Sequence, residues 1–429
     1  MTLIVLDDDP TGTQAVHGIP VMLEWDQASL ESVGARAPAA VHILVNTRAY
    51  TPEKAYEIVR DAGERALAAF PEGSRLINRG DSTLRAHVFE EYRAASEVAF
   101  PGRDPVLLLV PALPPAGRVT VGGVHYVESD GDRTPLHDTE YAGDGGFRYT
   151  DARLLQWAED RSGGHFQRAD GAEISLETIR GEGGAKAVAD TLEELSERGR
   201  PAACVPDVET NEDMAVIAEG LSLAWEHGAA VMPRSAPTFV GVVAGTLATE
   251  LAPPPEKPER LLVVCGSYVP ATTRQLARLL EDHPGALVEV DVEALASDGP
   301  EDEMTRAGGE VRDRLDRDGL AVMATPRERP TATINLAAGE RIADNLALIL
   351  HELDRRPDVV LSKGGITSAV TARVGLGATE ALVVGPIADG VALWHARADD
   401  GATVPYIVFP GNVGGDDAVR AVVAQILRA

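Results

Sequence analysis

The sequence predicts an α/β protein made of two α/β domains, and three observations lead to this prediction. Short runs of β-branched and apolar residues alternate with longer amphipathic stretches, which is the pattern of βα units. At 429 residues, the chain is longer than one ordinary hydrophobic core supports. A stiff proline-rich segment, APPPEKP at 252–258, separates two such halves. We therefore expect domains at 1–251 and 259–429, joined by a linker at 252–258.

The first half is expected to alternate strands with long helices. The expected strands are Leu3–Leu6, Val41–Val45, Arg75–Ile77, Val106–Val110 and Ala202–Val205. The expected helices are Pro52–Ala69, Leu84–Ala99, Ala185–Arg198 and Glu212–His227. Pro52 suits the first turn of a helix, with Thr51 as its N-cap. The stretch 114–170, rich in Gly, Asp and Arg, interrupts the alternation and predicts long loops or a small inserted β-structure.

The second half resumes the same alternation after the linker. Its expected strands are Leu261–Cys265, Leu287–Val290, Ala321–Ala324, Val359–Ser362, Ala381–Val384 and Tyr406–Phe409. Its expected helices are Thr272–Leu280, Gly308–Asp318, Ala338–Leu353 and Ser368–Val374. This order of elements indicates a second α/β domain.

Composition narrows the classes of function. The formal net charge of −28 disfavours nucleic acid and anionic membranes as partners, so a small anionic ligand needs locally placed Arg, Lys or helix N-termini. No apolar run reaches the length of a membrane helix and no signal peptide is evident, which predicts a cytoplasmic protein. Cys204 and Cys265 lie far apart and are expected to be buried, reduced thiols. The sequence does not determine the oligomeric state, and a homo-oligomer is one of the possibilities.

An acidic turn directly after the first strand is the strongest local signal. Asp7, Asp8 and Asp9 precede a Pro-Thr-Gly-Thr turn. Three adjacent carboxylates repel one another unless a cation or hydrogen-bond donors offset their charge. Because the carboxyl ends of parallel strands are where α/β proteins bind ligands, we expect a binding site here. A solvated acidic turn is the alternative.

The segment DSTLR at 81–85 is a second candidate. Asp81 or Ser82 is expected to cap a helix whose first turn contains Arg85, so that N–H groups, two hydroxyls and a guanidinium meet an anionic ligand. The same residues fit a simple capping sequence equally well. Arg48, which follows another strand, is a candidate for a second cation.

Three glycine turns follow strands of the second half, at 265–267, 362–368 and 410–415. Glycine lets a backbone approach a ligand closely, and a helix N-terminus carries a partial positive charge. Three such turns in one domain favour nucleotide binding. The P-loop, the GxGxxG fingerprint, HExxH and GxSxG are all missing from the sequence.

A competing motif uses the same acidic turn. Asp7-x-Asp9-x-Thr11 fits the DxDxT motif of haloacid-dehalogenase-type phosphatases, with Thr47, Lys363 and the pair at 416–417 as its later motifs. These residues are spread over both predicted domains, whereas that family's core is compact. This interpretation also leaves 81–85 and the glycine turns without a role.

Taken together, the motifs resemble those of the four-carbon acid sugar kinases. The family's ADDFTGA-like motif is matched by Asp7–Thr13, its DSTLRG-like motif by Arg79–Ala86 and its P-A-x-P-x-x-G-R-x-T-x-x-G-like stretch by Pro111–Gly123. Its C-terminal motifs are matched by Cys265–Ser267 and by the GG-x-T of Gly364–Thr367. The resemblance covers essentially the whole chain, in the family's order.

The resemblance implies an N-terminal sugar-acid-binding domain and a C-terminal ATP-binding domain. The implied reaction is phosphorylation of a terminal hydroxyl on an acid such as threonate, erythronate or 3-oxo-tetronate. Carried over by position, the substrate-facing residues are Asp8, Asp9, Arg48, Asp81, Ser82, Thr83, Leu84 and Arg85. The ATP-facing residues are Ser267, Gly364, Gly365, Thr367, Gly411, Asn412, Val413 and Gly414.

The expected mechanism follows from these positions. Asp8 or Asp9 accepts the hydroxyl proton, Arg48 and Arg85 clamp the substrate carboxylate, and Mg²⁺ offsets the charge of the phosphates. The chain departs from the family pattern at Pro10, Ala86 and Arg79, and the loop at 409–414 lacks the usual Lys and Phe. The first two departures bear on the substrate and the last on the nucleotide. A non-catalytic or degenerate sugar-acid- and nucleotide-binding paralogue therefore stays an alternative.

Overall fold

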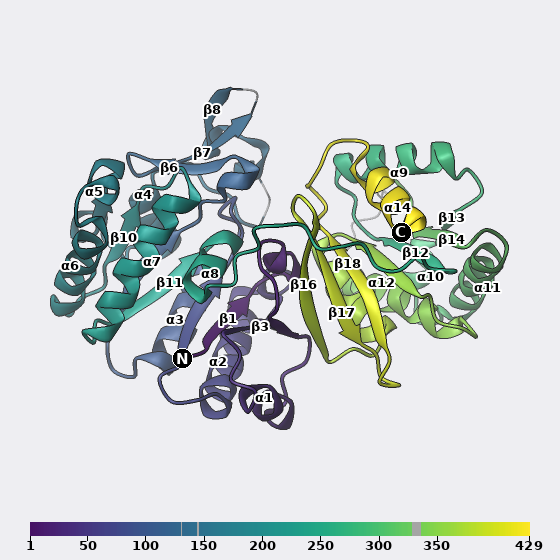
Figure 1. Ribbon diagram of the computed structural model, residues 1–429, viewed down its shortest axis with the longest axis horizontal. Helices are drawn as coiled ribbons and strands as arrows, with labels where there is room; N and C mark the ends of the chain where they lie inside the picture. Colours follow the sequence, from purple (N-terminus) through teal and green to yellow (C-terminus); the bar gives the residue numbers. More distant parts are fainter. Residues whose placement is uncertain (130, 144–145, 328–335) are drawn as a thin grey trace. The chain divides into compact units, whose positions relative to one another are not determined.

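The computed structural model describes the chain except residues 130, 144–145 and 328–335 (Figure 1). Two compact units make up the protein: residues 1–12 with 25–247, and residues 13–24 with 248–429. From the sequence, we expected the chain to cross from one domain to the other once, at the linker 252–258. The segment 13–24, which has no distinctive composition, belongs to the second unit. The two units are described separately below.

The first unit is a parallel sheet of strand order β3-β1-β4-β11-β5-β10-β9. Its strands are β1 Leu3–Asp7, β3 Ala40–Leu44, β4 Arg75–Arg79, β5 Val106–Val110, β9 Ala172–Ile174, β10 Ala203–Pro206 and β11 Val231–Ser235. The five strands predicted in this half are confirmed, while β9 and β11 were not predicted. Every residue of β1, β5 and β11 is buried, as expected for strands covered on both faces.

Helices surround this sheet. They are α1 Gln27–Gly34, α2 Pro52–Ala69, α3 Val88–Ala99, α4 Leu154–Arg161, α5 Leu176–Arg180, α6 Gly184–Glu197, α7 Asn211–Glu226 and α8 Pro237–Ala244. The predicted start of α2 is confirmed, because the Thr51 side chain accepts a hydrogen bond from the Lys54 N–H and Pro52 occupies the first turn. Short 3-10 helices complete the unit: η1 Pro10–Thr13, η2 Thr47–Ala49, η3 Pro114–Ala116, η4 Leu136–Asp138, η5 Glu140–Gly143 and η6 Arg168–Asp170.

The interruption predicted at 114–170 contains a separate three-stranded antiparallel sheet. Its strands are β6 Arg118–Val121, β7 Val124–Ser129 and β8 Asp132–Pro135. Figure 1 shows this ribbon projecting from the first unit. The prediction of a small inserted β-structure is confirmed, although α4 within the same stretch was not predicted.

The second unit contains a mixed sheet of order β13-β14-β12-β15-β18-β17-β16-β2. The first five strands are parallel, and β18, β17, β16 and β2 pair antiparallel. The strands are β2 Pro20–Met22, β12 Leu261–Cys265, β13 Leu287–Glu289, β14 Leu320–Ala324, β15 Val359–Lys363, β16 Glu380–Ala388, β17 Val391–Arg397 and β18 Thr403–Phe409. The sequence did not predict β2 or β17.

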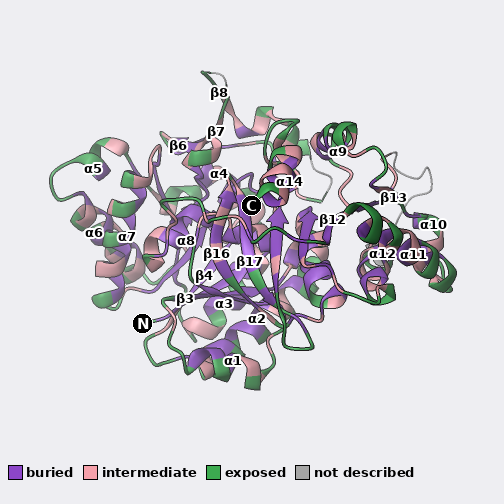
Figure 2. Cartoon of the chain, turned by 45° about the vertical axis from the view of Figure 1, so that its right-hand side comes forward, coloured by how far each residue is buried: buried purple, intermediate pink, exposed green. Residues whose placement is uncertain are grey.

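The helices of the second unit cover the parallel part of its sheet. They are α9 Pro270–Asp282, α10 Val292–Ala296, α11 Glu301–Asp318, α12 Leu336–Leu348, α13 Gly365–Val370 and α14 Ala418–Arg428, with η7 Ile349–Glu352 and the π-helical turn η8 Thr371–Gly375. Buried residues of β12, β15 and β18 form one core with α9 and α14. The strands are correspondingly coloured as buried in Figure 2. In the part of the chain that the structure describes, every helix is too short or too polar to cross a membrane.

Candidate active site

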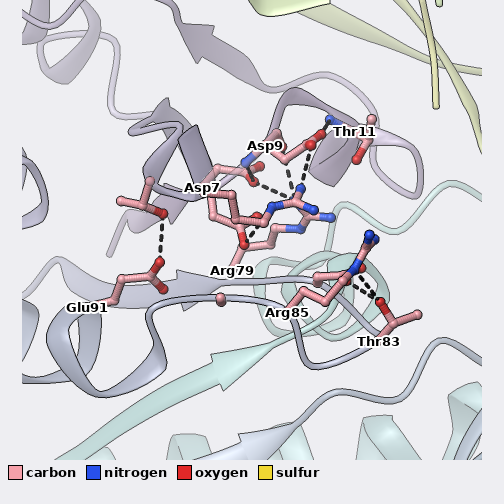
Figure 3. A network of polar contacts seen from close by, with 12 residues as sticks. Asp7, Asp9, Thr11, Arg79, Thr83, Arg85 and Glu91 are labelled. Atoms are coloured by element: carbon pink, nitrogen blue, oxygen red, sulfur yellow. Dashed lines mark hydrogen bonds and ion pairs between the residues drawn. The ribbon is translucent and has the colours of Figure 1, made fainter. Parts of the chain in front are cut away.

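The acidic turn predicted from the sequence starts at the carboxyl end of β1. Asp7 is fully buried; its Oδ2 lies 2.6 Å from Nδ1 of His42 on β3, and its Oδ1 accepts a 2.9 Å hydrogen bond from Nη1 of Arg79 on β4 (Figure 3). Burial by itself raises the pKa of Asp7, but the charge of Arg79 and the hydrogen bond with His42 outweigh it and hold that pKa below its ordinary value. Asp7 is therefore a structural anion.

Arg79 contacts all three aspartates of the acidic turn. Besides Asp7, its Nη1 donates to Oδ1 of Asp8 at 2.9 Å and to the backbone oxygen of Asp9 at 3.0 Å. The parallel register that puts Asp7 beside Arg79 makes this contact possible. The sequence had noted Arg79 only as a departure from the family motif, because the pairing of β1 with β4 is not visible in either segment alone.

Arg48 bridges the other two carboxylates of the turn. Its Nε lies 3.3 Å from Oδ2 of Asp8, and its Nη2 forms an ion pair with Oδ2 of Asp9. Burial by itself lowers the pKa of Arg48, but Asp8 and Asp9 outweigh that effect and raise it, so the guanidinium stays charged. The Asp8 side chain is 1% exposed, whereas those of Asp9 and Arg48 are 13% and 19% exposed. Asp9 and Arg48 thus form the solvent-facing edge of the turn.

A buried ion pair that the sequence did not predict lies behind Asp8. Arg234 at the end of β11 pairs through Nη1 with Glu91 of α3, and its Nη2 is 3.9 Å from Oδ2 of Asp8. Glu91 also accepts a 2.6 Å hydrogen bond from Oγ1 of Thr47. Arg234 and Glu91 are 143 residues apart. The one sequence signal was an arginine inside the apolar run Val231–Ser235.

These side chains form one charged network with an excess of carboxylates. We call it the carboxylate–guanidinium network; its acids are Asp7, Asp8, Asp9, Asp81 and Glu91, and its arginines are Arg48, Arg79, Arg85 and Arg234. Burial, with the charge of Glu91, raises the pKa of Asp8 to about 7, although Arg48, Arg79 and Arg234 act in the opposite direction. Asp8 therefore changes charge close to neutral pH.

The segment 81–85 does not cap a helix, and that prediction was wrong. Leu84 has φ +65°, a left-handed conformation that a helix cannot contain, and α3 begins only at Val88. Asp81 instead accepts hydrogen bonds from the Thr83 hydroxyl and, at 2.7 Å, from Nε of Arg85. Burial by itself raises the pKa of Asp81, but Arg85 and Arg48 outweigh it and hold the pKa well below its ordinary value. The Asp81 carboxylate closes a tight turn of its own.

The inserted β-structure supports this turn from outside. His125 of β7 donates from Nε2 to the carbonyl of Ser82 at 2.9 Å, and burial lowers the pKa of His125 to about 4, so its ring is neutral. The Tyr149 hydroxyl donates to the carbonyl of Thr83 at 3.0 Å. The guanidinium of Arg85 lies 5.7 Å from the centre of the Tyr141 ring. The stretch that breaks the α/β alternation therefore holds the segment 81–85 in its conformation.

Two glycines allow the network to close. A Cβ at Gly12 would lie 2.1 Å from Oδ2 of Asp7, and a Cβ at Gly80 would lie 2.0 Å from Nη2 of Arg234. Both neighbours are buried side chains with fixed partners. A larger residue at either position would displace a charged group from its partner.

In the second unit, the three predicted glycine turns follow β12, β15 and β18 and meet around Ser267. A Cβ at Gly364 would lie 3.2 Å from Cβ of Ser267, and one at Gly411 would lie 3.0 Å from Oγ of Ser267. Gly364 has φ +110°, and its N–H donates to the carbonyl of Phe409 at 2.8 Å. Parallel register brings these turns to the same edge of the sheet.

Helix α9 fastens the last of these turns. Oγ1 of Thr272 donates to the carbonyl of Gly411 at 3.1 Å. Nε2 of Gln275 donates to the carbonyls of Val413, Gly414 and Gly415 at 2.9, 3.0 and 3.0 Å. Asn412 and Gly414 are exposed, and Thr367 is partly exposed. The predicted nucleotide-facing residues therefore gather at one surface of the second unit.

Metal ligands are not clustered in the described part of the chain. Outside residues 130, 144–145 and 328–335, no group of three or more His, Cys, Asp or Glu side chains is arranged to hold an ion. Both cysteines are buried and free of disulfides, as predicted.

Comparison with known proteins assigns a class to each unit. Residues 3–243 match the sequence model of a sugar-binding N-terminal domain, and residues 262–419 match that of a nucleotide-binding C-terminal domain. The chain belongs to the four-carbon acid sugar kinase family, which this pair of domains defines. The predicted family and the predicted order of a sugar-binding and a nucleotide-binding domain are thereby confirmed.

Two relatives named as sugar-acid kinases align along nearly the full chain. A D-erythronate kinase from Heliobacterium modesticaldum is 28% identical over 455 residues, covering 99% of this chain and 97% of that protein. A D-threonate kinase from Salmonella typhimurium is 25% identical over 443 residues, covering 98% and 97%. Solved structures of proteins from Haemophilus influenzae and Salmonella typhimurium have TM-scores of 0.65 and 0.69 at 18% identity; they cover 100% and 99% of this chain and 100% and 98% of their own. At that identity the two structures show the fold alone.

Proposed function

We propose that this protein is an ATP-dependent kinase that phosphorylates the terminal hydroxyl of a small, four-carbon sugar acid. The observation that carries the proposal is the meeting of three glycine turns around Ser267, in a domain that belongs to a nucleotide-binding class. Phosphoryl transfer depends on positioning and on charge stabilisation more than on covalent chemistry by the protein. A backbone-lined surface beside strand ends is suited to hold a triphosphate.

The nucleotide would contact Ser267, Gly364, Gly365, Thr367 and the loop Gly411–Gly414. Glycine at these places keeps side chains out of the volume that phosphates would fill. Mg²⁺, when bound, offsets the negative charge that builds up on the transferred phosphoryl group.

The sugar acid would bind at the solvent-facing edge of the carboxylate–guanidinium network. A guanidinium has five N–H donors, so pairing with Asp8 and Asp9 leaves Arg48 with capacity for a further carboxylate. The Arg85 side chain, 23% exposed, borders the same network through Asp81. The hydroxyls of Ser82 and Thr83 belong to the same turn. We propose that Arg48 and Arg85 bind the substrate carboxylate. Ser82, Thr83 and Leu84 are only 7%, 1% and 3% exposed, so we propose that the turn 81–85 acts mainly by positioning Arg85.

Asp9 is our choice for the carboxylate that accepts the proton of the reacting hydroxyl. Asp7 is fully buried and held by two partners, and the Asp8 side chain is 1% exposed. Asp9, 13% exposed, is the acid of the turn that a ligand can reach. Asp8 lies behind it with a pKa of about 7 and sets the charge of the turn.

The phosphatase interpretation of the acidic turn is not supported. Its nucleophile would be Asp7, whose carboxylate is fully buried between His42 and Arg79. Thr47 hydrogen-bonds Glu91 instead of facing a ligand. The later motif residue Lys363 belongs to the other compact unit. Family membership agrees with this conclusion.

The test is coupled ADP release with Mg·ATP against a panel of sugar acids. The panel contains both threonates, both erythronates, their 3-oxo relatives, glycerate and five-carbon acids. We expect one four-carbon acid to exceed the others in kcat/KM by at least about tenfold. ATP binding without ADP formation across the panel would refute the kinase and favour the non-catalytic paralogue. Phosphate release from phosphate esters without ATP would revive the phosphatase.

A further inference from the structure

Two cations lie beneath the glycine turns, and the function proposed above does not use them. Lys363 is the last residue of β15 and is completely buried. Its Nζ donates to the carbonyl oxygens of Pro410 at 2.5 Å and Gly411 at 3.4 Å. The same ammonium lies 4.1 Å from the ring centre of Phe409, its register partner on β18. Lys363 therefore supports the third glycine turn from inside the domain.

Arg327 supports the first glycine turn in a similar way. It follows β14, and its Nη1 donates to the carbonyl of Ser267 at 2.7 Å. Nε and Nη2 both donate to the carbonyl of Thr325, at 3.1 and 2.6 Å. Nη1 also lies 3.9 Å from Sγ of Cys265, a register partner of Lys363 on β12. The two cations are thus linked through the end of one strand.

Neither cation has a carboxylate within 4 Å among the residues that the structure describes. This is unusual for Lys363, which is completely buried, whereas Arg327 is partly exposed. The four arginines of the carboxylate–guanidinium network are all paired with acids. A buried ammonium without a counter-ion is costly unless an anion binds nearby. Consistent with this, burial lowers the pKa of Lys363 to about 7, and Cys265 opposes the effect only in part.

The peptide groups that the cations contact have a defined orientation. A trans peptide is planar, so a carbonyl and the N–H of the next residue point in opposite directions. Because the carbonyls of Pro410 and Gly411 point toward Lys363, the N–H groups of Gly411 and Asn412 point away from it. Neither N–H has a hydrogen-bond partner among the described residues. Consecutive N–H groups of a turn that point outward are the donors that an anion-binding nest uses.

We propose that Lys363 and Arg327 are positioning residues of the phosphate site: they orient the glycine turns and supply the positive charge that the polyphosphate of a nucleotide requires. This inference rests on the proposed function. The ligand chemistry is that of a nucleoside di- or triphosphate. The cations act through the backbone, because three carbonyls stand between their charged groups and the surface of the turns. Their effect should therefore grow with the number of phosphates.

The test is calorimetric binding of adenosine, AMP, ADP and ATP to the whole chain and to its variants. We expect Lys363→Met and Arg327→Met each to weaken ATP binding at least about tenfold, ADP binding less, and adenosine binding by less than about twofold. Lys257→Met, at an exposed linker lysine of the same unit, is the matched control and should change nothing. Equal weakening for all four ligands would mean a purely structural role and would overturn the proposal.

A pH series on the unaltered chain provides a second measurement that needs no variant to fold. Protonated Lys363 attracts phosphate, so ATP affinity should fall as pH rises through about 7. The groups that face Lys363 are the Cys265 thiol on β12, Phe409 on β18 and, through Cys265, Arg327; the pKa of the thiol is raised, so it stays neutral in this range. Arg327→Met should keep this dependence, and Lys363→Met should reduce it to that of ATP itself. The same dependence in Lys363→Met as in the unaltered chain would refute the charge role.

The two proposals fail separately. Undiminished ATP binding by both methionine variants would reject the positioning role and leave the kinase intact. Normal phosphate-dependent binding with no turnover on any sugar acid would reject the kinase and leave the positioning role intact.

Discussion

The two candidate sites differ in whether their cations are paired with acids. In the first unit, every arginine of the carboxylate–guanidinium network is paired with an acid, and the acids are in excess. In the second unit, Lys363 and Arg327 contact backbone carbonyls and have no acid nearby among the described residues. In the part of this acidic chain that the structure describes, one site thus has paired charges and the other has positive charges without an acidic partner.

The difference teaches how each ligand can be recognised. A paired network has little net attraction for an anion, so selectivity must come from directed hydrogen bonds to carboxylate and hydroxyl groups. A cation without an acidic partner, beneath backbone N–H groups, attracts phosphate by its net charge. This attraction depends little on the remainder of the ligand. The first arrangement is suited to choose among similar sugar acids, and the second to hold a polyphosphate.

The largest expected effect concerns the paired site. Arg234→Met should lower the free energy of unfolding by about 3–5 kcal/mol, because it leaves the buried Glu91 without its guanidinium partner. Chemical denaturation measures it. Adding Glu91→Gln should recover part of the loss, since coupled residues are not additive. Lys186→Met, which breaks an exposed pair with Asp190, is the control and should leave stability unchanged. A similar small loss in both variants would mean that the network is not coupled.

The second largest expected effect is on turnover and comes from the acidic turn. Asp9→Asn should lower kcat about 100-fold or more, if Asp9 accepts the hydroxyl proton. Asp8→Asn should have a smaller effect at pH 8. Because the pKa of Asp8 is raised to about 7, its charge is lost as pH falls through 7; activity that needs this charge should fall in the same range, and Asp8→Asn should remove that dependence. A larger loss of kcat for Asp8→Asn than for Asp9→Asn would reverse the assignment.

The third largest expected effect concerns the glycine turns, whose function should depend on their backbone conformation. Gly364→Ala introduces a Cβ at φ +110° and 3.2 Å from Ser267, so we expect the KM for ATP to rise about tenfold or more, with the KM for the sugar acid unchanged. Gly401→Ala, at φ +82° with open space around it, matches the backbone strain but lies in an exposed turn. Equal effects of the two substitutions on ATP would show that general strain, and not the turn, is responsible.

The smallest expected effect is on the chemical labelling of the two cysteine thiols. Burial raises the pKa of Cys204 in the first unit to about 12 and raises that of Cys265 beneath the glycine turns. Neither should react with a thiol reagent at pH 8 while the chain is folded. Any slow labelling reports local opening of the unit concerned. Faster labelling of Cys265 that ATP does not slow would argue against a nucleotide at that site.

Much of the fold was predictable from local patterns. The alternation of apolar runs predicted the parallel strands of both units, and Thr51-Pro52 fixed the start of α2 because capping depends on adjacent residues. The glycine turns at 265–267, 362–368 and 410–415 were located because turn chemistry is also local. The predicted helix start at 81–85 was wrong, since hydrogen bonds from Thr83 and Arg85 to Asp81, with Leu84 in a left-handed conformation, outweigh capping propensity.

By itself, the sequence determined the class of fold, the order of the two domains, the acidic turn and the glycine turns, because each depends on neighbours along the chain. Only the tertiary structure decided which charges meet. Arg79 joins Asp7 through strand register, Arg234 joins Glu91 across 143 residues, and Lys363 meets the turn after β18. An ion pair needs its partners within about 4 Å, and that distance is set by how strands and helices pack, which no spacing along the chain encodes.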